Sequence, residues 1–168
     1  MTETLKANID SHLIPVLKTV SDPEIPVLTV LDLGVIREAT EQEDGVVSIK
    51  LTPTYSGCPA MDVIGDDLKK AFSEIGKKAT IDLILSPAWS TDLISEEGLQ
   101  KMEAYGIARP LTETADKGVL LDNKKLVKCT NCGSTNTHLV SQFGSTACKA
   151  LFKCDDCQEP FDYFKCLK

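Results

Sequence analysis

Cys129-Thr130-Asn131-Cys132-Gly133 and Cys154-Asp155-Asp156-Cys157 are the stretches that decide the fold of the C-terminal part of this chain. Each contains a C-x2-C pair, and 21 residues separate the two pairs. Each pair aims two sulfurs at one point, and a hairpin between the pairs can bring all four around one ion. Tetrahedral thiolate coordination is what Zn2+ prefers in a structural site. The spacing therefore predicts a structural zinc ribbon whose ligands are Cys129, Cys132, Cys154 and Cys157.

The ribbon is expected to depend on its metal. About 40 residues bury too little apolar surface to fold alone, so metal ligation must supply much of the stability. Two further cysteines, Cys148 and Cys166, lie inside this stretch. They are either small buried apolar residues or members of another ligand set, since six thiols within 38 residues can also hold an iron–sulfur cluster.

Composition places the chain among ordinary globular proteins. It has 168 residues, of which 42% are hydrophobic and 26% are charged, which suits one medium domain with a small appendage. There is no run of 18 apolar residues and no secretory signal at the start, so no membrane association is expected. Seven cysteines, an odd number with two C-x2-C pairs, argue against a disulfide scaffold and favour the reducing cytoplasm.

The charge distribution argues against nucleic-acid binding. The net charge is −7, but residues 1–123 carry −10 and residues 124–168 carry +3. Four thiolates around one Zn2+ would leave the ribbon nearly neutral. An acidic body repels phosphate backbones, and a nearly neutral ribbon does not overcome that repulsion.

The N-terminal part alternates between strand and helix patterns. Apolar residues at helical spacing between Leu5 and Val20 predict a first helix. Because of Pro15, either its regular part begins near residues 12–14 or the helix bends there. The expected elements that follow are strands at 35–40 and 46–51, a helix at 60–75, a strand at 80–85 and a short helix from 95 to about 105. This order predicts an α/β (α+β) domain with helices on one face of a small mixed sheet. The expected divisions are the α/β domain at 1–106, a linker at 107–125 and the zinc ribbon at 126–168.

Cys58 is the seventh cysteine and stands apart from the ribbon. Pro59 favours the first helical position, which makes Cys58 the predicted N-cap of the helix at 60–75. A thiol there would meet free backbone N–H groups and the positive end of the helix dipole, which favours a reactive thiolate. Nucleophilic catalysis would need a base in reach, and neither His12 nor His138 sits in a pattern that promises one. The preferred hypothesis is therefore that Cys58 makes a transient contact with iron or a cluster. The alternative is that Cys58 is a buried cysteine without a chemical role.

Several motifs resemble a known family along nearly the whole chain. Asp22-Pro23-Glu24, Asp32-Leu33-Gly34, Gly57-Cys58-Pro59 and Ser86-Pro87-Ala88-Trp89 resemble the small domain of the SufT and CIA-type iron–sulfur assembly proteins. The ribbon blocks at 144–150 and 159–166 resemble the PaaD (PaaJ) family of accessory proteins encoded with the phenylacetyl-CoA 1,2-epoxidase.

The resemblance implies a role in maturation. A member of this family would be a non-enzymatic accessory factor that helps insert an iron–sulfur or di-iron centre into epoxidase components, with the [2Fe–2S] reductase as the natural client. Cys58 would match the family's reactive cysteine, and the four ribbon thiols would match its zinc-type ligands. The alternatives are a purely structural subunit of the oxygenase, with Cys58 inert, and a thiol enzyme. Whether the chain forms a homodimer is left open by the sequence.

Overall fold

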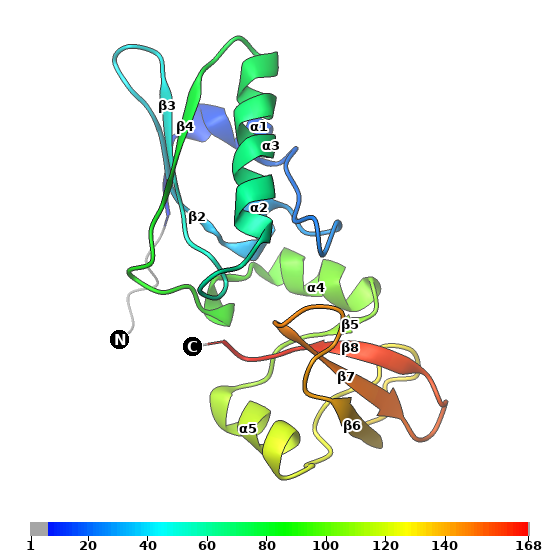
Figure 1. Ribbon diagram of the computed structural model, residues 1–168. Coiled ribbons are helices and arrows are strands. Elements are labelled where there is room, and N and C mark those ends of the chain that lie inside the picture. The colour runs from blue at the N-terminus through cyan, green and yellow to red at the C-terminus, as the bar shows by residue number, and fades with distance from the viewer. Residues whose placement is uncertain (1–6, 168) are drawn as a thin grey trace. The chain divides into compact units, whose positions relative to one another are not determined.

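The computed structural model describes residues 7–167, which fold as two compact units that meet in sequence at Gly98 and Leu99. Figure 1 shows the elements of each unit. The expected boundary at residue 106 and the expected linker at 107–125 differ from this division, because residues 107–125 belong to the second unit. Every helix within residues 7–167 is too short or too polar to cross a lipid bilayer.

The first unit is built on a four-stranded mixed sheet. Its strands are β1 (Asn8–Ile9), β2 (Ile36–Glu41), β3 (Val47–Leu51) and β4 (Ala79–Leu83), in the order β1-β2-β3-β4. β2 and β3 are antiparallel, whereas β1 pairs with β2 and β4 pairs with β3 in parallel. Helix α3 (Ala60–Glu74) connects the parallel strands β3 and β4 and lies along one face of the sheet (Figure 1). The predicted α/β architecture, with helices on one face of a small mixed sheet, is confirmed.

The core of this unit follows from two periodicities. Alternate residues of β3 are buried, which directs Val47, Ile49 and Leu51 to one face of the sheet. Helix α3 buries a stripe that recurs every three or four residues: Ala60, Met61, Ile64, Gly65, Leu68 and Phe72. The stripe and the buried face of the sheet enclose the core of the first unit.

Pro15 limits the first helix as predicted. A 3-10 turn over Ser11–Leu13 leads into α1 (Ile14–Leu17), so Pro15 falls in the first turn, where its missing N–H costs nothing. Leu5, the start of the apolar pattern, lies outside the described residues. The apolar face itself is formed, since Leu13 and Leu17 are buried.

Helix α2 (Val30–Leu33) is short and held by a capping box. The Thr29 hydroxyl accepts from the Asp32 N–H at 3.1 Å, and Asp32 Oδ2 accepts from the Thr29 N–H at 3.0 Å. Gly34 follows with φ of +71°, and a Cβ built there would lie 2.3 Å from the Leu93 carbonyl oxygen. Only glycine fits this position.

The second unit carries helices α4 (Glu96–Ala104) and α5 (Glu113–Leu121) and a second sheet, although α4 begins before its boundary. The strands are β5 (Ile107–Ala108), β6 (Thr137–Ser141), β7 (Lys149–Cys154) and β8 (Pro160–Phe164), in the order β5-β8-β7-β6. β7 is antiparallel to both β6 and β8, and β5 joins β8 in parallel. Phe152 and Tyr163 meet edge to face, with ring centroids 5.4 Å apart, in the apolar core.

Hydrogen bonds to buried groups tie the expected linker to this sheet. The Tyr163 hydroxyl donates to Asp116 Oδ1 at 2.6 Å and accepts from the Leu111 N–H at 3.2 Å. The Cys166 N–H donates to the same carboxylate oxygen at 2.9 Å. Both Tyr163 and Asp116 are buried. Burial raises the pKa of the tyrosine, and the hydrogen bond to the Asp116 carboxylate raises it further. Residues 107–125 therefore form a structural part of the second unit.

Candidate functional site

The four predicted ribbon thiols come together at one point. The sulfur atoms of Cys129, Cys132, Cys154 and Cys157 all lie within 4.8 Å of one another. Cys129 Sγ and Cys157 Sγ are 3.6 Å apart, as are Cys132 Sγ and Cys154 Sγ. A tetrahedral site with Zn–S bonds of about 2.3 Å has sulfur–sulfur edges of about 3.8 Å. The arrangement of the thiols therefore fits a structural zinc ion.

Two tight turns place the sulfurs. In the first, the Gly133 N–H donates to the Cys129 carbonyl at 2.9 Å, and Gly133 adopts φ of +75°. In the second, Cys154 ends β7 and its N–H donates to the Glu159 carbonyl at 2.9 Å. Antiparallel strands β6 and β7 bring the two turns to the same end of the sheet.

Asn131 supports the thiols from within the first turn. Its backbone N–H donates to Cys129 Sγ at 3.4 Å, and its side-chain amide donates to Cys157 Sγ at 3.5 Å. In the metal-free chain the amide hydrogen bond is the largest of the effects that lower the pKa of Cys157 to about 6. Asn131 was not among the predicted site residues. The sequence signal that could have identified it is an amide side chain between the two cysteines of one C-x2-C pair, where it can reach a thiol of the other pair.

Two aspartates brace the second turn. Asp156 accepts from the Ser134 hydroxyl and, at 2.8 Å, from the Asn136 amide, and these hydrogen bonds lower its pKa. The Asp155 carboxylate lies 2.8 Å from His138 Nδ1 and 3.3 Å from Lys125 Nζ. His138 is therefore engaged by a carboxylate at the ribbon surface.

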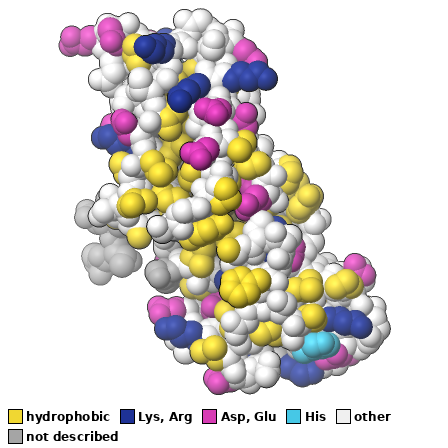
Figure 2. All heavy atoms as spheres, viewed as in Figure 1, with side chains coloured by type: hydrophobic (Ala, Val, Ile, Leu, Met, Phe, Trp, Pro, Cys, Tyr) yellow, Lys and Arg dark blue, Asp and Glu magenta, His cyan; other side chains and the backbone are white. Residues whose placement is uncertain are grey.

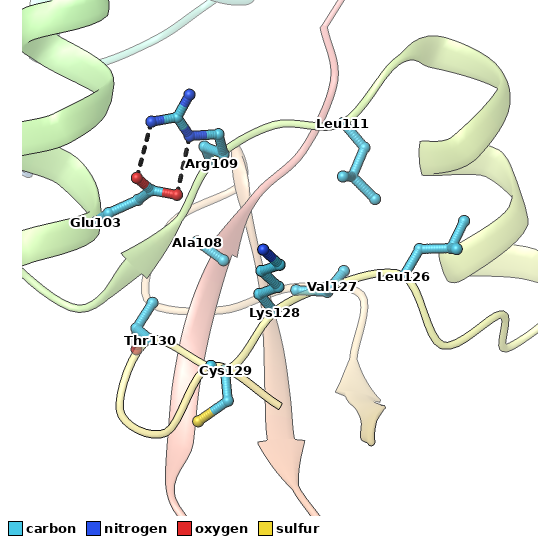
Figure 3. A pocket seen from close by; sticks show the side chains of 10 residues that line it. Glu103, Ala108, Arg109, Leu111, Leu126, Val127, Lys128, Cys129 and Thr130 are labelled. Atoms are coloured by element: carbon cyan, nitrogen blue, oxygen red, sulfur yellow. Dashed lines mark hydrogen bonds and ion pairs between the residues drawn. The ribbon is translucent and has the colours of Figure 1, made fainter. Parts of the chain in front are cut away.

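A hollow opens beside the first turn (Figure 3). Its volume is about 550 Å³, and Cys129 forms part of its wall. Arg109 reaches Glu103 through two hydrogen bonds, from Nε at 2.9 Å and from a terminal nitrogen at 2.8 Å. The apolar part of the lining is Ala108, Leu111, Leu126 and Val127. The turn that carries Cys129 thus borders a partly apolar hollow with a two-hydrogen-bond ion pair in its lining.

Cys58 lies one residue further from the helix than predicted. Helix α3 begins at Ala60 and its N-cap is Pro59, which adopts helical backbone angles. The backbone of Cys58 is fixed by two hydrogen bonds: its N–H donates to the Tyr55 carbonyl at 3.2 Å, and its carbonyl accepts from the Met61 N–H at 3.3 Å. The predicted N-cap role of Cys58 is therefore wrong. Its side chain is 9% exposed, at the limit of burial.

Both histidines are engaged by carboxylates. His12 Nε2 lies 2.7 Å from Glu41 Oε2, and His138 is engaged by Asp155. Within residues 7–167 no hydrogen bond joins Cys58 to a base. The arrangement therefore gives no support to a Cys–His catalytic pair.

Two residues of the quoted motifs, Asp22 and Trp89, have structural roles in the first unit. Asp22 Oδ1 accepts from the N–H groups of Glu24 and Ile25 at 2.7 and 2.8 Å, so this carboxylate caps the backbone of the turn. Trp89 is 4% exposed and its indole N–H donates to the Leu33 carbonyl at 2.9 Å, as expected of a core residue. Thr52 is fully buried, and its hydroxyl is the one buried side-chain oxygen without a partner within residues 7–167.

Cys148 and Cys166 do not join the thiol cluster. Cys148 is buried and its sulfur lies 3.0 Å from the Thr146 hydroxyl. Cys166 is partly buried and its N–H caps the Asp116 carboxylate. Within residues 7–167 the cluster contains four thiols, so the alternative set of six ligands is not formed.

Comparison with known proteins assigns a family to each unit. Residues 12–83 match the iron–sulfur cluster assembly protein family, and residues 113–165 match the PaaD zinc beta ribbon domain. A relative from Escherichia coli, named as one of the subunits of a "Putative 1,2-phenylacetyl-CoA epoxidase", is 43% identical over 152 residues, which cover 90% of this chain and 89% of the relative.

Two shorter relatives match somewhat more than half of this chain. An "Fe-S protein maturation auxiliary factor" from Porphyromonas gingivalis is 37% identical over 55% of this chain and 90% of its own length. A similarly named factor, YitW, from Bacillus subtilis is 34% identical over 56% of this chain and 90% of its own length. The matches to the two parts, and to the E. coli relative along most of both chains, have one explanation. The chain belongs to the PaaD family, which joins an iron–sulfur cluster assembly domain to a zinc beta ribbon.

Proposed function

We propose that this protein is a non-catalytic accessory factor in the maturation of the phenylacetyl-CoA 1,2-epoxidase, where it helps an iron–sulfur or di-iron centre to be assembled. One observation carries the proposal: a domain similar to iron–sulfur maturation factors and a four-thiol ribbon occur in one chain that is 43% identical to a protein named as an epoxidase component. The first domain would contribute the assembly function, and the ribbon would direct it to the epoxidase.

The ribbon serves as a docking module held by structural zinc. Cys129, Cys132, Cys154 and Cys157 are the proposed ligands, because all four sulfurs lie within 4.8 Å of one another and two of the distances, 3.6 Å each, are close to the edges of a tetrahedral site. The hollow beside Cys129 offers an apolar surface with one ion pair on its rim, which suits an apolar side chain of a client protein. The [2Fe–2S] reductase component is the proposed client.

Cys58 is the proposed transient contact for iron or a cluster in transit. Ser56 and Gly57 before it are exposed, and Gly57 adopts φ of +80° in open space. Cargo would reach Cys58 from this solvent-facing side of the loop. Because the residue is 9% exposed, the loop has to open before the sulfur can contact the cargo.

The second candidate is a structural subunit of the epoxidase in which Cys58 is inert. The burial of Cys58 favours it, since small buried cysteines are common in cores without any chemical role. The two candidates differ in what they predict for the client, and not in what they predict for the fold.

Substitution of Cys58 separates the two candidates. The reductase is produced with the wild-type protein, with Cys58→Ser or with Cys148→Ser, and its iron and acid-labile sulfide are measured per chain. Cys148 is a matched control, because it is similarly buried but lies outside both the loop and the thiol cluster. A loss of client cluster with Cys58→Ser alone supports the carrier role. Full client loading with both variants would instead support the structural subunit.

Metal analysis of the purified chain, under air and under anaerobic conditions, tests the ribbon assignment. About one zinc and no iron is expected per chain. Stoichiometric iron with acid-labile sulfide would move the ribbon thiols to a cluster and refute structural zinc.

A further inference from the structure

Strand β4 forms an open edge of the first sheet. The Val47 N–H donates to the Lys78 carbonyl, and the Ile84 N–H donates to the Leu51 carbonyl, both at 2.8 Å. In a parallel ladder the N–H and C=O of one residue point to the same side, and successive residues alternate. The even-numbered residues of β4 therefore face β3, and Ala79, Ile81 and Leu83 direct their backbone groups outward. Within residues 7–167 no strand covers this edge.

A groove runs between this edge and helix α3. Its floor contains Met61, Ile81 and Leu83, and its volume is about 320 Å³. Leu83 is 54% exposed although its side chain lies on the core face of the sheet. In Figure 2, viewed as in Figure 1, hydrophobic side chains gather down the middle of this unit, between the positions of α3 and β4. The rim on the helix side carries Asp62, Asp66 and Lys69. Exposed, flat edges of this kind pair with other strands unless they are blocked.

We propose that β4 pairs with β4 of a second copy of this chain, in an antiparallel register that joins the two sheets of the dimer into one. In this register Thr80 lies opposite Thr80 of the partner subunit, and Lys78 lies opposite Asp82 of the partner subunit. All three side chains are exposed on the face away from α3. Lys78 and Asp82 make no ion pair within residues 7–167, so both are available for a partner.

Charge selects this register from its neighbours. Only even shifts are allowed, because outward-facing residues must meet outward-facing residues. A shift of two residues in either direction removes both symmetry-related lysine–aspartate pairs. A shift of four places Lys78 against Lys78 of the partner subunit, or Asp82 against Asp82 of the partner subunit. Like charges directly opposite each other destabilise a strand pair, whereas opposite charges stabilise it.

Helix α3 gives an independent check of the register. It runs antiparallel to β4, as a right-handed crossover between parallel neighbours requires. Gly65 lies over Ile81, since a Cβ built on Gly65 would be 3.6 Å from the Ile81 side chain. Thr80 precedes Ile81 on β4 by one residue, a distance of about 3.3 Å along the strand. Because α3 runs in the opposite direction and rises about 1.5 Å per residue, this distance corresponds to about two residues after Gly65. The symmetry axis through Thr80 thus passes near residue 67 of α3.

The axis position makes the two helices complementary as well. With the axis near residue 67, Asp66 of one copy faces Lys69 of the partner subunit, and the pair is repeated by symmetry. Within one copy these two side chains lie 3.9 Å apart and both are largely exposed, which makes a weak ion pair. The helix residues compared here are not those that select the strand register, and their charges are complementary about the same axis. The groove would then be filled by the helix of the second copy.

Charge reversal tests the proposed dimer. The association of the full-length, metal-loaded chain is measured by sedimentation equilibrium, and a dimer is expected for the wild type. Lys78→Glu and Asp82→Lys should each raise the dissociation constant by on the order of tenfold or more, because two symmetry-related pairs become repulsive. The double variant Lys78→Glu/Asp82→Lys should restore dimerisation. Lys18→Glu, at an exposed lysine that follows α1 and lies in neither β4 nor its neighbouring strand, is a control that should leave the dissociation constant unchanged.

Cross-linking tests the register directly. Thr80→Cys should give a reducible covalent dimer under mild oxidation, because cysteines opposite each other at the axis can meet. Leu85→Cys, which lies beyond β4 at an exposed position, should give none above the wild-type background. A monomeric wild type at about 100 μM, a dimer that tolerates both single reversals, or a double variant that fails to recover would each overturn the proposal. So would an edge that binds only a different protein.

Discussion

Replacement of Tyr163 by phenylalanine tests how the second unit is held together. The variant keeps the ring and its packing against Phe152, and removes only the hydroxyl. Two hydrogen bonds are lost: one to the buried Asp116 carboxylate at 2.6 Å, and one from the Leu111 N–H at 3.2 Å. A hydrogen bond to a charged group contributes about 1.5–3 kcal/mol and a neutral one about 0.5–1.5 kcal/mol. Because the Cys166 N–H still donates to Asp116, we expect a total loss of about 2–4 kcal/mol.

Hydrogen exchange measured by mass spectrometry gives the free energy of opening for each part of the chain. Tyr163→Phe should lower it for peptides from α5, β7 and β8 by that amount, which corresponds to exchange about 30-fold to 1,000-fold faster. Peptides from β2 and β3 in the first unit are the internal control and should not change. If α5 keeps its wild-type protection, the hydrogen bonds to Asp116 do not hold this helix in place, and the reasoning is refuted.

The same tyrosine predicts a dependence on alkaline pH. Burial and the Asp116 carboxylate raise the pKa of Tyr163 in the folded state. Its stabilising contribution is therefore complete below the unfolded-state pKa of about 10 and is lost as pH rises above that value. Above pH 10 the stability of the wild-type second unit should fall more steeply than that of Tyr163→Phe, by up to about 1.4 kcal/mol per pH unit. Equal slopes would contradict the raised pKa.

Three further predictions concern the metal and two buried positions. Cys154→Ser, or chelation of the wild type, should remove the zinc and the exchange protection of the ribbon, since zinc binding is coupled to folding; a variant that kept one zinc per chain would contradict this. Thr52→Val should leave the first unit unchanged or stabilise it by up to about 1 kcal/mol in urea unfolding, because the unpaired buried hydroxyl is replaced by a methyl group; a loss of more than about 1 kcal/mol would show a hidden partner. Gly34→Ala should cost more than about 3 kcal/mol, because its Cβ would meet the Leu93 carbonyl, whereas Gly45→Ala, with a similar φ in open space, should cost about 1 kcal/mol; similar losses would rule out the clash.

The thiol cluster could be predicted from the sequence because its geometry is local. Two residues between paired cysteines fix each turn, and one hairpin brings the turns together, so spacing alone places Cys129, Cys132, Cys154 and Cys157. Strands β2, β3 and β4 and the long helix of the first unit were also predicted within one or two residues, since their periodicities are strong, whereas the two-residue strand β1 was not predicted. Regular patterns of burial, repeated over a whole element, are the signal that a sequence carries most clearly.

The remaining features depend on contacts between distant residues. Helix α5 has nine residues and a weak apolar pattern, and its position depends on Tyr163, which lies 47 residues after Asp116. The predicted N-cap of the long helix was one residue too early. Pro59 adopts helical backbone angles and occupies the N-cap position, although its side chain makes no capping hydrogen bond. The hydrogen bond from the Asn131 amide to Cys157 could not be predicted, because it forms only in the folded chain, where the second turn lies beside the first.

The indole of Trp89 has a practical consequence. It is the single tryptophan of the chain, and it is buried in the first unit with its N–H bonded to the Leu33 carbonyl. Intrinsic emission excited selectively at tryptophan therefore monitors unfolding of the first unit. It does not report metal loss or unfolding in the second unit. Comparing emission with circular dichroism during a titration would time the two events separately, with no label attached.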